Sequence, residues 1–215
     1  MKKYKSTDQI GYTCGIYCLI IADCILNENP FDRDYYYSII KKCVEQSYTK
    51  IGEIFDISTL QKITTHLFSH LNAETYNSTT VKDVKTLLDK YIIIMPVTIG
   101  TDKTPHYILL YKNRYGRIIR YNASCKYVFS LSSLLKNNNS IADKYTWPKK
   151  LVFPSNFKNK INNFFMWILN KSNLQYRQKY FNNIFNVARE HGIIKVDDID
   201  SVNMNGKFLL ISKHV

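Results

Sequence analysis

The sequence contains no apolar run long enough to cross a membrane, and it has little glycine or proline. No segment reaches the roughly 18 uninterrupted apolar residues that a membrane-spanning helix needs. Seven glycines and five prolines in 215 residues accompany a bias toward Lys, Asn, Ile and Tyr, which indicates an AT-rich bacterial or viral genome. Internal repeats, Gly/Ser-rich linkers and acidic tails are also missing. The remaining composition, 45% hydrophobic and 22% charged, is that of a globular protein with an ample core.

Acidic residues are under-represented. Seventeen Asp and Glu oppose thirty Lys and Arg, so the net charge is +13 and the sequence pI is about 9.4. Such a charge favours association with an anionic partner, whether nucleic acid, a membrane surface or an acidic protein. No run of five or six basic residues occurs, however, so we expect no specific nucleic-acid partner.

The cysteine pattern indicates neither a disulfide framework nor a metal site. Their number is odd and their spacing is irregular: Cys14, Cys18, Cys24, Cys43 and Cys125. A zinc site usually needs a second close pair of Cys or His, and none has the usual spacing. In the segment HLFSH, Leu67 stands where a zinc protease needs glutamate, so His66 and His70 are expected to be partly exposed helix residues. We therefore expect no metal and no other cofactor.

A cleavable signal peptide is not expected either. The apolar stretch that follows MKKYK is interrupted by Asp23, and a cleavage site of small residues is missing. We expect a cytoplasmic protein with reduced thiols, or one that is secreted into a host cell without a cleavable signal peptide.

Four helices are predicted in the first ninety residues. Residues 14–27 are apolar on nearly all sides, which is typical of a helix in the middle of a domain. A second helix is predicted at about 34–46. A third follows the segment DIST at 56–59 and runs through LQKITTHLFSHL, and a fourth covers STTVKDVKTLLDKY. Ser58 or Thr59 is a suitable N-cap for the third helix. Thr79 or Thr80 is suitable for the fourth.

A change of period after residue 90 predicts a sheet. YIIIMPVTIG is a continuous apolar run rich in β-branched residues, typical of a buried strand. HYILLYK and RIIRYNAS flank the turn signal NRYG and form a predicted hairpin. SLSSLLKN predicts a short helix, and YTWPKKLVF predicts a last strand. Helices followed by an antiparallel sheet predict an α+β domain over residues 1–155.

Residues 156–215 are predicted to form a C-terminal α/β extension of unknown role, packed on the first domain. Helical patterns cover Phe157–Leu169 and Leu174–His191, and GIIKV and KFLLIS are typical of strands. An apolar stripe on the first of these helices is expected to pack on its own domain rather than to lie on a membrane surface: Ile161, Phe164, Phe165 and Ile168.

Cys14 stands at the predicted start of the first helix. A thiolate is stabilised at a helix N-terminus by unpaired N–H groups and the macrodipole. The alternative is a buried free cysteine, the commonest fate of cysteine in a core. Catalysis would need a base, and His106 is the best candidate because it opens a strand at the rim of the predicted sheet. His191 and His214 fall in the extension and compete poorly.

Two further side chains complete a candidate catalytic set. Asn122 lies at the exit of the strand after His106, and adjacent antiparallel strands bring such positions to one end of a sheet, where the amide could orient the imidazole. Gln9 could donate its amide N–H to a developing oxyanion, together with the backbone N–H of Cys14. This ordered set favours catalysis over the buried-cysteine interpretation. Cys18, one helical turn after Cys14, is expected to pack in the core.

These segments resemble papain-like cysteine peptidases, most closely the C39 and C39-like group. DQIGYTCGIYCL is similar to the family's Gln…Cys-Gly segment, and TLLDKYIIIMPVTIG…HYILLYKNRYGRIIRYNAS is similar to its later half. YTWPKKLVF resembles its closing strand, so the resemblance covers about residues 4–153. It implies a papain-like fold with Cys14, His106 and Asn122 as catalytic residues and Gln9 beside them. The chain departs from the family in two places: Asn122 and Ala123 replace the usual Asp-Pro, and Gln9 is one residue closer to the cysteine.

The resemblance implies a cysteine-dependent amide hydrolase that acts on a protein or peptide. The first expectation is a protease with a Cys-His-Asn triad and a thioester acyl-enzyme, serving as a bacterial effector or a peptide-maturation enzyme. The same triad would also serve a glutamine deamidase or an acyltransferase. A non-catalytic basic binding module, whose affinity would fall with salt, is the alternative from another class. The substrate, the scissile bond and the oligomeric state stay open.

Overall fold

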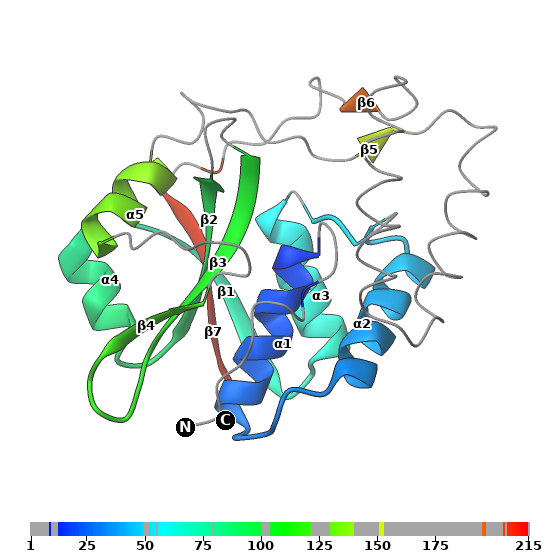
Figure 1. The fold of residues 1–215 in the computed structure, drawn as a ribbon, viewed down its shortest axis with the longest axis horizontal. Helices are drawn as coiled ribbons and strands as arrows, with labels where there is room; N and C mark the ends of the chain where they lie inside the picture. The colour runs from blue at the N-terminus through cyan, green and yellow to red at the C-terminus, as the bar shows by residue number, and fades with distance from the viewer. Residues whose placement is uncertain are drawn as a thin grey trace.

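The described part of the chain folds into a five-stranded antiparallel sheet with helices on both faces (Figure 1). The computed structural model describes residues 9, 13–49, 52–54, 56–78, 80–99, 104–121, 130–139, 151–152, 195–196, 204 and 206–214. The helices are α1 (Cys14–Leu26), α2 (Arg33–Glu45), α3 (Ile57–Leu67), α4 (Val81–Leu87) and α5 (Leu131–Asn139). The strands of the sheet are β1 (Leu71–Asn77), β2 (Ile92–Ile99), β3 (Thr104–Lys112), β4 (Ile118–Tyr121) and β7 (Lys207–Lys213). The mixture of helices and antiparallel strands is compatible with the predicted α+β class.

The sheet has the order β1-β7-β2-β3-β4. Every adjacent pair in it is antiparallel. A separate short pair joins β5 (Leu151–Val152) to β6 (Lys195–Val196). Among the described residues, β4 and β1 are therefore the outer strands, and β7 and β2 lie in the middle of the sheet.

One face of the sheet is covered by α1, α2 and α3. Helix α1 is buried from Gly15 to Cys24, because its residues are apolar on nearly every side, as the sequence predicts. Its side chains form one core with those of α2, α3 and the facing residues of the sheet. The sheet residues in this core alternate along the strands, as Ile92, Ile94, Tyr107 and Leu109 do.

The opposite face is covered by α4 and α5 (Figure 1). The residues that alternate with the first set, such as Ile93, Met95, Ile108 and Leu110, pack here against Val84, Leu88, Leu134 and Leu135. Strands β2 and β3 are consequently buried on both sides, which accounts for their continuous apolar sequences.

The carboxyl-terminal strand β7 lies inside the sheet. It pairs with β1 along its whole length and with β2 through Leu209, Leu210 and Ile211. The predicted boundary at residue 155 therefore does not separate this strand from the sheet of the first domain. That the rest of residues 156–215 form an extension packed on the first domain stays a prediction, because most of these residues lie outside the described ones.

Most of the predicted elements are present, with local shifts. Helices α1, α2, α4 and α5, strand β2 and the β3–β4 hairpin lie within a few residues of their predicted ranges, and Thr80 caps α4. The predicted cap of α3 is wrong: Asp56, not Ser58 or Thr59, accepts hydrogen bonds there, so the helix begins at Ile57. The Asp56 carboxylate serves because it stands one residue before the first helical turn.

The end of α3 and the end of the sheet also differ from the prediction. The helix stops at Leu67, and the chain turns between Phe68 and Leu71 into strand β1, which the sequence does not predict. Strand β1 has one buried residue in seven, so its sequence lacks an apolar alternation. The predicted last strand at 145–153 contains only β5 among the described residues, and β5 pairs with β6 rather than with the main sheet.

Candidate active site

Cys14 is the first residue of α1. Thr13 is the N-cap, and its carbonyl accepts the first helical hydrogen bond from the Tyr17 N–H at 2.8 Å. The Thr13 side chain makes no capping bond but is hydrogen-bonded to the hydroxyl of Tyr36, and both residues are fully buried. Helix α2 therefore holds the start of α1 in place and thereby positions Cys14.

The thiol of Cys14 lies beside the start of β3. Burial raises the pKa of Cys14 from 9.0 to about 11, and hydrogen bonding with the backbone of Tyr107 is the largest effect in the opposite direction. The next turn of α1 meets the same residue, because Cys18 Sγ donates to the Tyr107 carbonyl at 3.6 Å. Cys18 itself is buried in the core, as expected. The fold thus brings together the two segments that the sequence predicts to carry the nucleophile and its base.

Gly15 permits this close approach. A Cβ atom at this position would lie 3.3 Å from Cδ2 of Tyr107, 3.2 Å from Cδ1 of Leu60 and 3.4 Å from Cβ of Ile54. Distances this short leave no room for a side chain without movement of the neighbours. The glycine that follows Cys14 therefore sets how closely α1 packs on β3 and α3.

His106 lies near the start of β3 and is 5% exposed. It is paired with Val97 of β2, whose side chain packs on the α4 and α5 face. Tyr107, the next residue, packs on the α1 face. Regular alternation would therefore direct the imidazole away from α1, so an imidazole that serves Cys14 must turn around the beginning of the strand.

The structure says less about the other two predicted residues, Gln9 and Asn122. Gln9 is partly buried, and its Oε1 is shielded from solvent. Asn122 lies outside the described residues; the strand before it ends at Tyr121, which pairs with Leu109 of β3. The structure therefore does not place the proposed amide next to His106.

Tyr36 and Tyr107 are the two residues that the sequence analysis missed. Tyr36 holds Thr13, and Tyr107 supplies backbone groups to both Cys14 and Cys18. Tyr107 directly follows the candidate base His106, and this position in the sequence could have identified it as part of the site. Tyr36 belongs to a Tyr-Tyr-Tyr run in α2, and nothing in the sequence distinguishes it from its two neighbours.

The described part of the chain offers no alternative centre built on a metal. It holds no group of three or more His, Cys, Asp or Glu side chains placed to bind a metal ion. Within the same residues, every helix is too short or too polar to span a bilayer.

Comparison with known proteins supports a relation to proteases. Residues 4–108 match the family model described as the actin maturation protease-like, C-terminal domain. The match includes Gln9, Cys14 and His106 and ends before Asn122. No curated protein and no solved structure matches the chain. The amino-terminal half of this protein is therefore similar to a protease-related family of the papain-like kind, while the narrower resemblance to the C39 group is not confirmed.

Proposed function

We propose that this protein is a cysteine-dependent peptidase with Cys14 as its nucleophile. The observation that carries the proposal is the match of residues 4–108 to a protease-like domain, together with the position of Cys14 at the start of a buried helix beside β3. A cysteine at such a helix end has unpaired backbone N–H groups nearby that favour its thiolate.

The proposed reaction proceeds in two stages. His106 deprotonates Cys14, the thiolate attacks the substrate carbonyl, and the resulting imidazolium gives the proton to the leaving amine. A thioester forms between Cys14 and the acyl part of the substrate. Water, deprotonated by His106, then attacks this thioester; the C–S bond breaks, the carboxylic acid is released, and the imidazolium returns its proton to the Cys14 sulfur.

In the proposed mechanism, two further residues assist catalysis. Asn122 would accept a hydrogen bond from the imidazole and hold the ring toward the thiol. Gln9 would donate its side-chain N–H to the oxyanion of the tetrahedral intermediate, together with the backbone N–H of Cys14. Gln9 and Cys14 both fall within the family match, which supports their pairing.

The environment of Cys14 defines what the base must achieve. With a pKa of about 11, the isolated thiol would be almost entirely protonated at neutral pH. An imidazole within hydrogen-bond reach would make the thiolate accessible as an ion pair. The proposal therefore requires His106 to reach the α1 side of the sheet when the enzyme is active.

Peptide cleavage by the full chain tests the proposal. The protein is incubated with a complex peptide mixture, and new termini are identified by mass spectrometry for wild type, Cys14→Ala, Cys14→Ser and Cys18→Ala. We expect cleavage by wild type and by Cys18→Ala, and none by either Cys14 variant. Cleavage that survives Cys14→Ala would show that another residue is the nucleophile.

The same experiment separates the related reactions. Hydrolysis of a peptide bond yields two fragments that together gain one water. A deamidase would instead convert glutamine to glutamate within an intact peptide, and an acyltransferase would join an amine to the acyl fragment. Because all three pass through the same thioester, only the products distinguish them. We propose hydrolysis because the family match is to a protease-like domain.

A further inference from the structure

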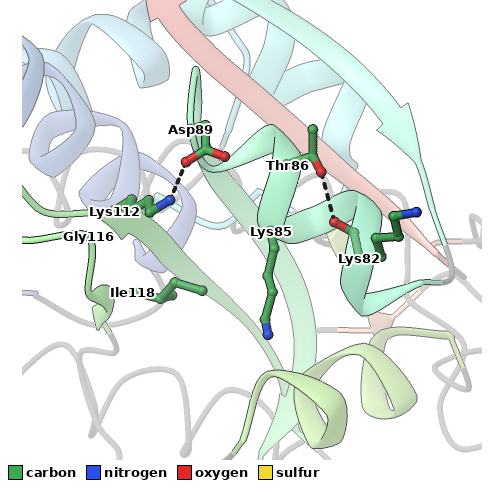
Figure 2. Close-up of a pocket in the computed structure, with 7 residues that line it drawn as sticks. All are labelled: Lys82, Lys85, Thr86, Asp89, Lys112, Gly116 and Ile118. Carbon is green, nitrogen blue, oxygen red and sulfur yellow. Dashed lines mark hydrogen bonds and ion pairs between the residues drawn. The ribbon is translucent and has the colours of Figure 1, made fainter.

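A basic groove lies on the face of the sheet opposite α1. It has a volume of about 470 Å³ and runs between α4, with the turn after it, and the β3–β4 hairpin. Its walls carry Lys82 and Lys85 from α4 and Lys112 from β3. Figure 2 shows Lys85 extending from the helix into the open space beside Ile118 of β4. We call this site the lysine groove.

Most of the positive charge in the lysine groove is not neutralised by the protein. Lys112 forms an ion pair with Asp89 at one end. Lys82 and Lys85 have no ion-pair partner in the described part of the chain. Figure 2 shows the side chains of Lys82 and Lys85 extending in different directions from α4, so each ammonium group is available to a separate anionic group of a ligand.

The hairpin beside the groove presents an exposed aromatic ring. Tyr115 is 66% exposed, and the guanidinium of Arg114 lies 4.8 Å from its ring centroid. The turn is well supported, because the Asn113 side chain accepts hydrogen bonds from the backbone N–H groups of Tyr115 and Arg117, at 3.0 and 2.9 Å. The Arg114 guanidinium also donates a hydrogen bond to the Tyr115 hydroxyl at 2.7 Å, which holds the ring at the hairpin tip, and Arg117 follows two residues later.

We propose that the lysine groove and the hairpin tip bind single-stranded nucleic acid without sequence preference. Lys82 and Lys85 each contact a phosphate group, and a base stacks on Tyr115. A positively charged groove next to an aromatic ring is the usual combination in proteins of this kind. The concave shape disfavours a flat membrane surface, and an acidic peptide would make no use of the exposed ring.

Separated segments explain why the sequence does not reveal this site. Lys82 and Lys85 lie about thirty residues before Lys112 and the hairpin, and no basic run joins them. The antiparallel pairing of β3 with β4, and the packing of α4 on the sheet, bring them to one place. The proposal concerns a face that does not include Cys14, so it stands independently of the peptidase.

Fluorescence anisotropy with the full chain tests the proposal. The probe is a labelled oligothymidylate of about 20 nucleotides, titrated over a range of salt concentrations. We expect binding that weakens steeply with salt. Removing two phosphate contacts with Lys82→Ala/Lys85→Ala should reduce the slope of log K against log salt by about 1.4. Tyr115→Ala should weaken binding roughly tenfold, as expected for the loss of one stacked base.

Matched controls distinguish this site from general charge. Lys42→Ala/Lys62→Ala removes the same charge from exposed positions on α2 and α3, and it should leave the slope nearly unchanged. Cys14→Ala should bind as wild type does, whatever its effect on peptide cleavage. If the two double variants reduced the slope of log K against log salt equally, the proposal would be overturned. Absence of oligothymidylate binding at low salt would also overturn it. Stronger groove-dependent binding of a glutamate-rich peptide or of anionic vesicles would assign the groove to another partner.

Discussion

Replacing Tyr36 with phenylalanine removes one oxygen atom from the support of the candidate nucleophile. The hydroxyls of Tyr36 and Thr13 are hydrogen-bonded to each other, and both residues are fully buried. Removing one partner of a buried hydrogen bond costs about 1–3 kcal/mol. The Tyr36 ring also contacts Tyr17 and Phe31, at centroid separations of 5.5 and 5.8 Å, and phenylalanine retains these contacts.

We therefore expect Tyr36→Phe to lower the free energy of unfolding by about 2 kcal/mol. For a protein of this size, such a loss corresponds to a decrease in Tm of about 4–8 °C. Thermal and urea unfolding followed by circular dichroism would measure it. The control is Tyr76→Phe, which removes the same atom from a residue that is 37% exposed on β1 and should change the stability by less than about 0.5 kcal/mol.

A double variant checks whether the loss comes from the Thr13–Tyr36 bond. Thr13→Val removes the same hydrogen bond from the other side. The combination with Tyr36→Phe should cost clearly less than the sum of the two single variants, because the shared bond can be lost only once. Strictly additive costs, or a Tyr36→Phe loss no larger than that of Tyr76→Phe, would refute the assignment of Tyr36 as a support for α1.

Three further predictions concern glycine and cysteine positions. Gly15→Ala should slow peptide cleavage while thermal unfolding shifts only modestly, because overpacking against Leu60, Tyr107 and Ile54 at about 1–3 kcal/mol is partly offset by the helix propensity of alanine; unchanged cleavage kinetics would contradict it. Gly206→Ala should destabilise the protein by about 1–2 kcal/mol in urea unfolding, since φ is +67° and the new Cβ would lie 2.5 Å from Asn77 Oδ1; an equally stable variant would refute this. Burial raises the pKa of Cys43 from 9.0 to about 12. The folded state keeps this thiol neutral, so its contribution to stability is complete below pH 9 and is lost as the pH rises toward 12. Urea unfolding between pH 9 and pH 11 should therefore show a smaller fall in stability for Cys43→Ala than for wild type, and parallel curves would contradict it.

The helices and central strands were predictable because their apolar residues repeat with a clear period. Helix α1 is buried nearly all round, and β2 and β3 are buried on both faces, so each produces a continuous apolar segment. Strand β1 was not predictable from such a pattern, because it has only one buried residue. Its place in the sheet depends on pairing with β7, at least 130 residues later in the chain.

The candidate site was predictable in part. The sequence indicates that Cys14 begins a helix and that His106 begins a strand, and the structure brings these two segments together. The sequence could not indicate the direction of the His106 side chain, because this direction depends on the pairing of β3 with β2 and on the first residues of β3. The support from Tyr36 depends on the packing of α2 against α1, which no local pattern encodes.

The most direct test of the catalytic proposal is the pH dependence of Cys14 alkylation, measured peptide by peptide with limiting iodoacetamide in wild type and His106→Ala. Without an imidazole, the thiol should react with a profile that rises only toward its pKa of about 11. If His106 serves Cys14, wild type should instead alkylate rapidly at Cys14 near pH 6 to 7, ahead of the buried Cys18 and Cys43, and His106→Ala should lose this reactivity. Identical profiles that rise only at alkaline pH in both proteins would contradict the thiolate–imidazolium pair on which the proposed peptidase depends.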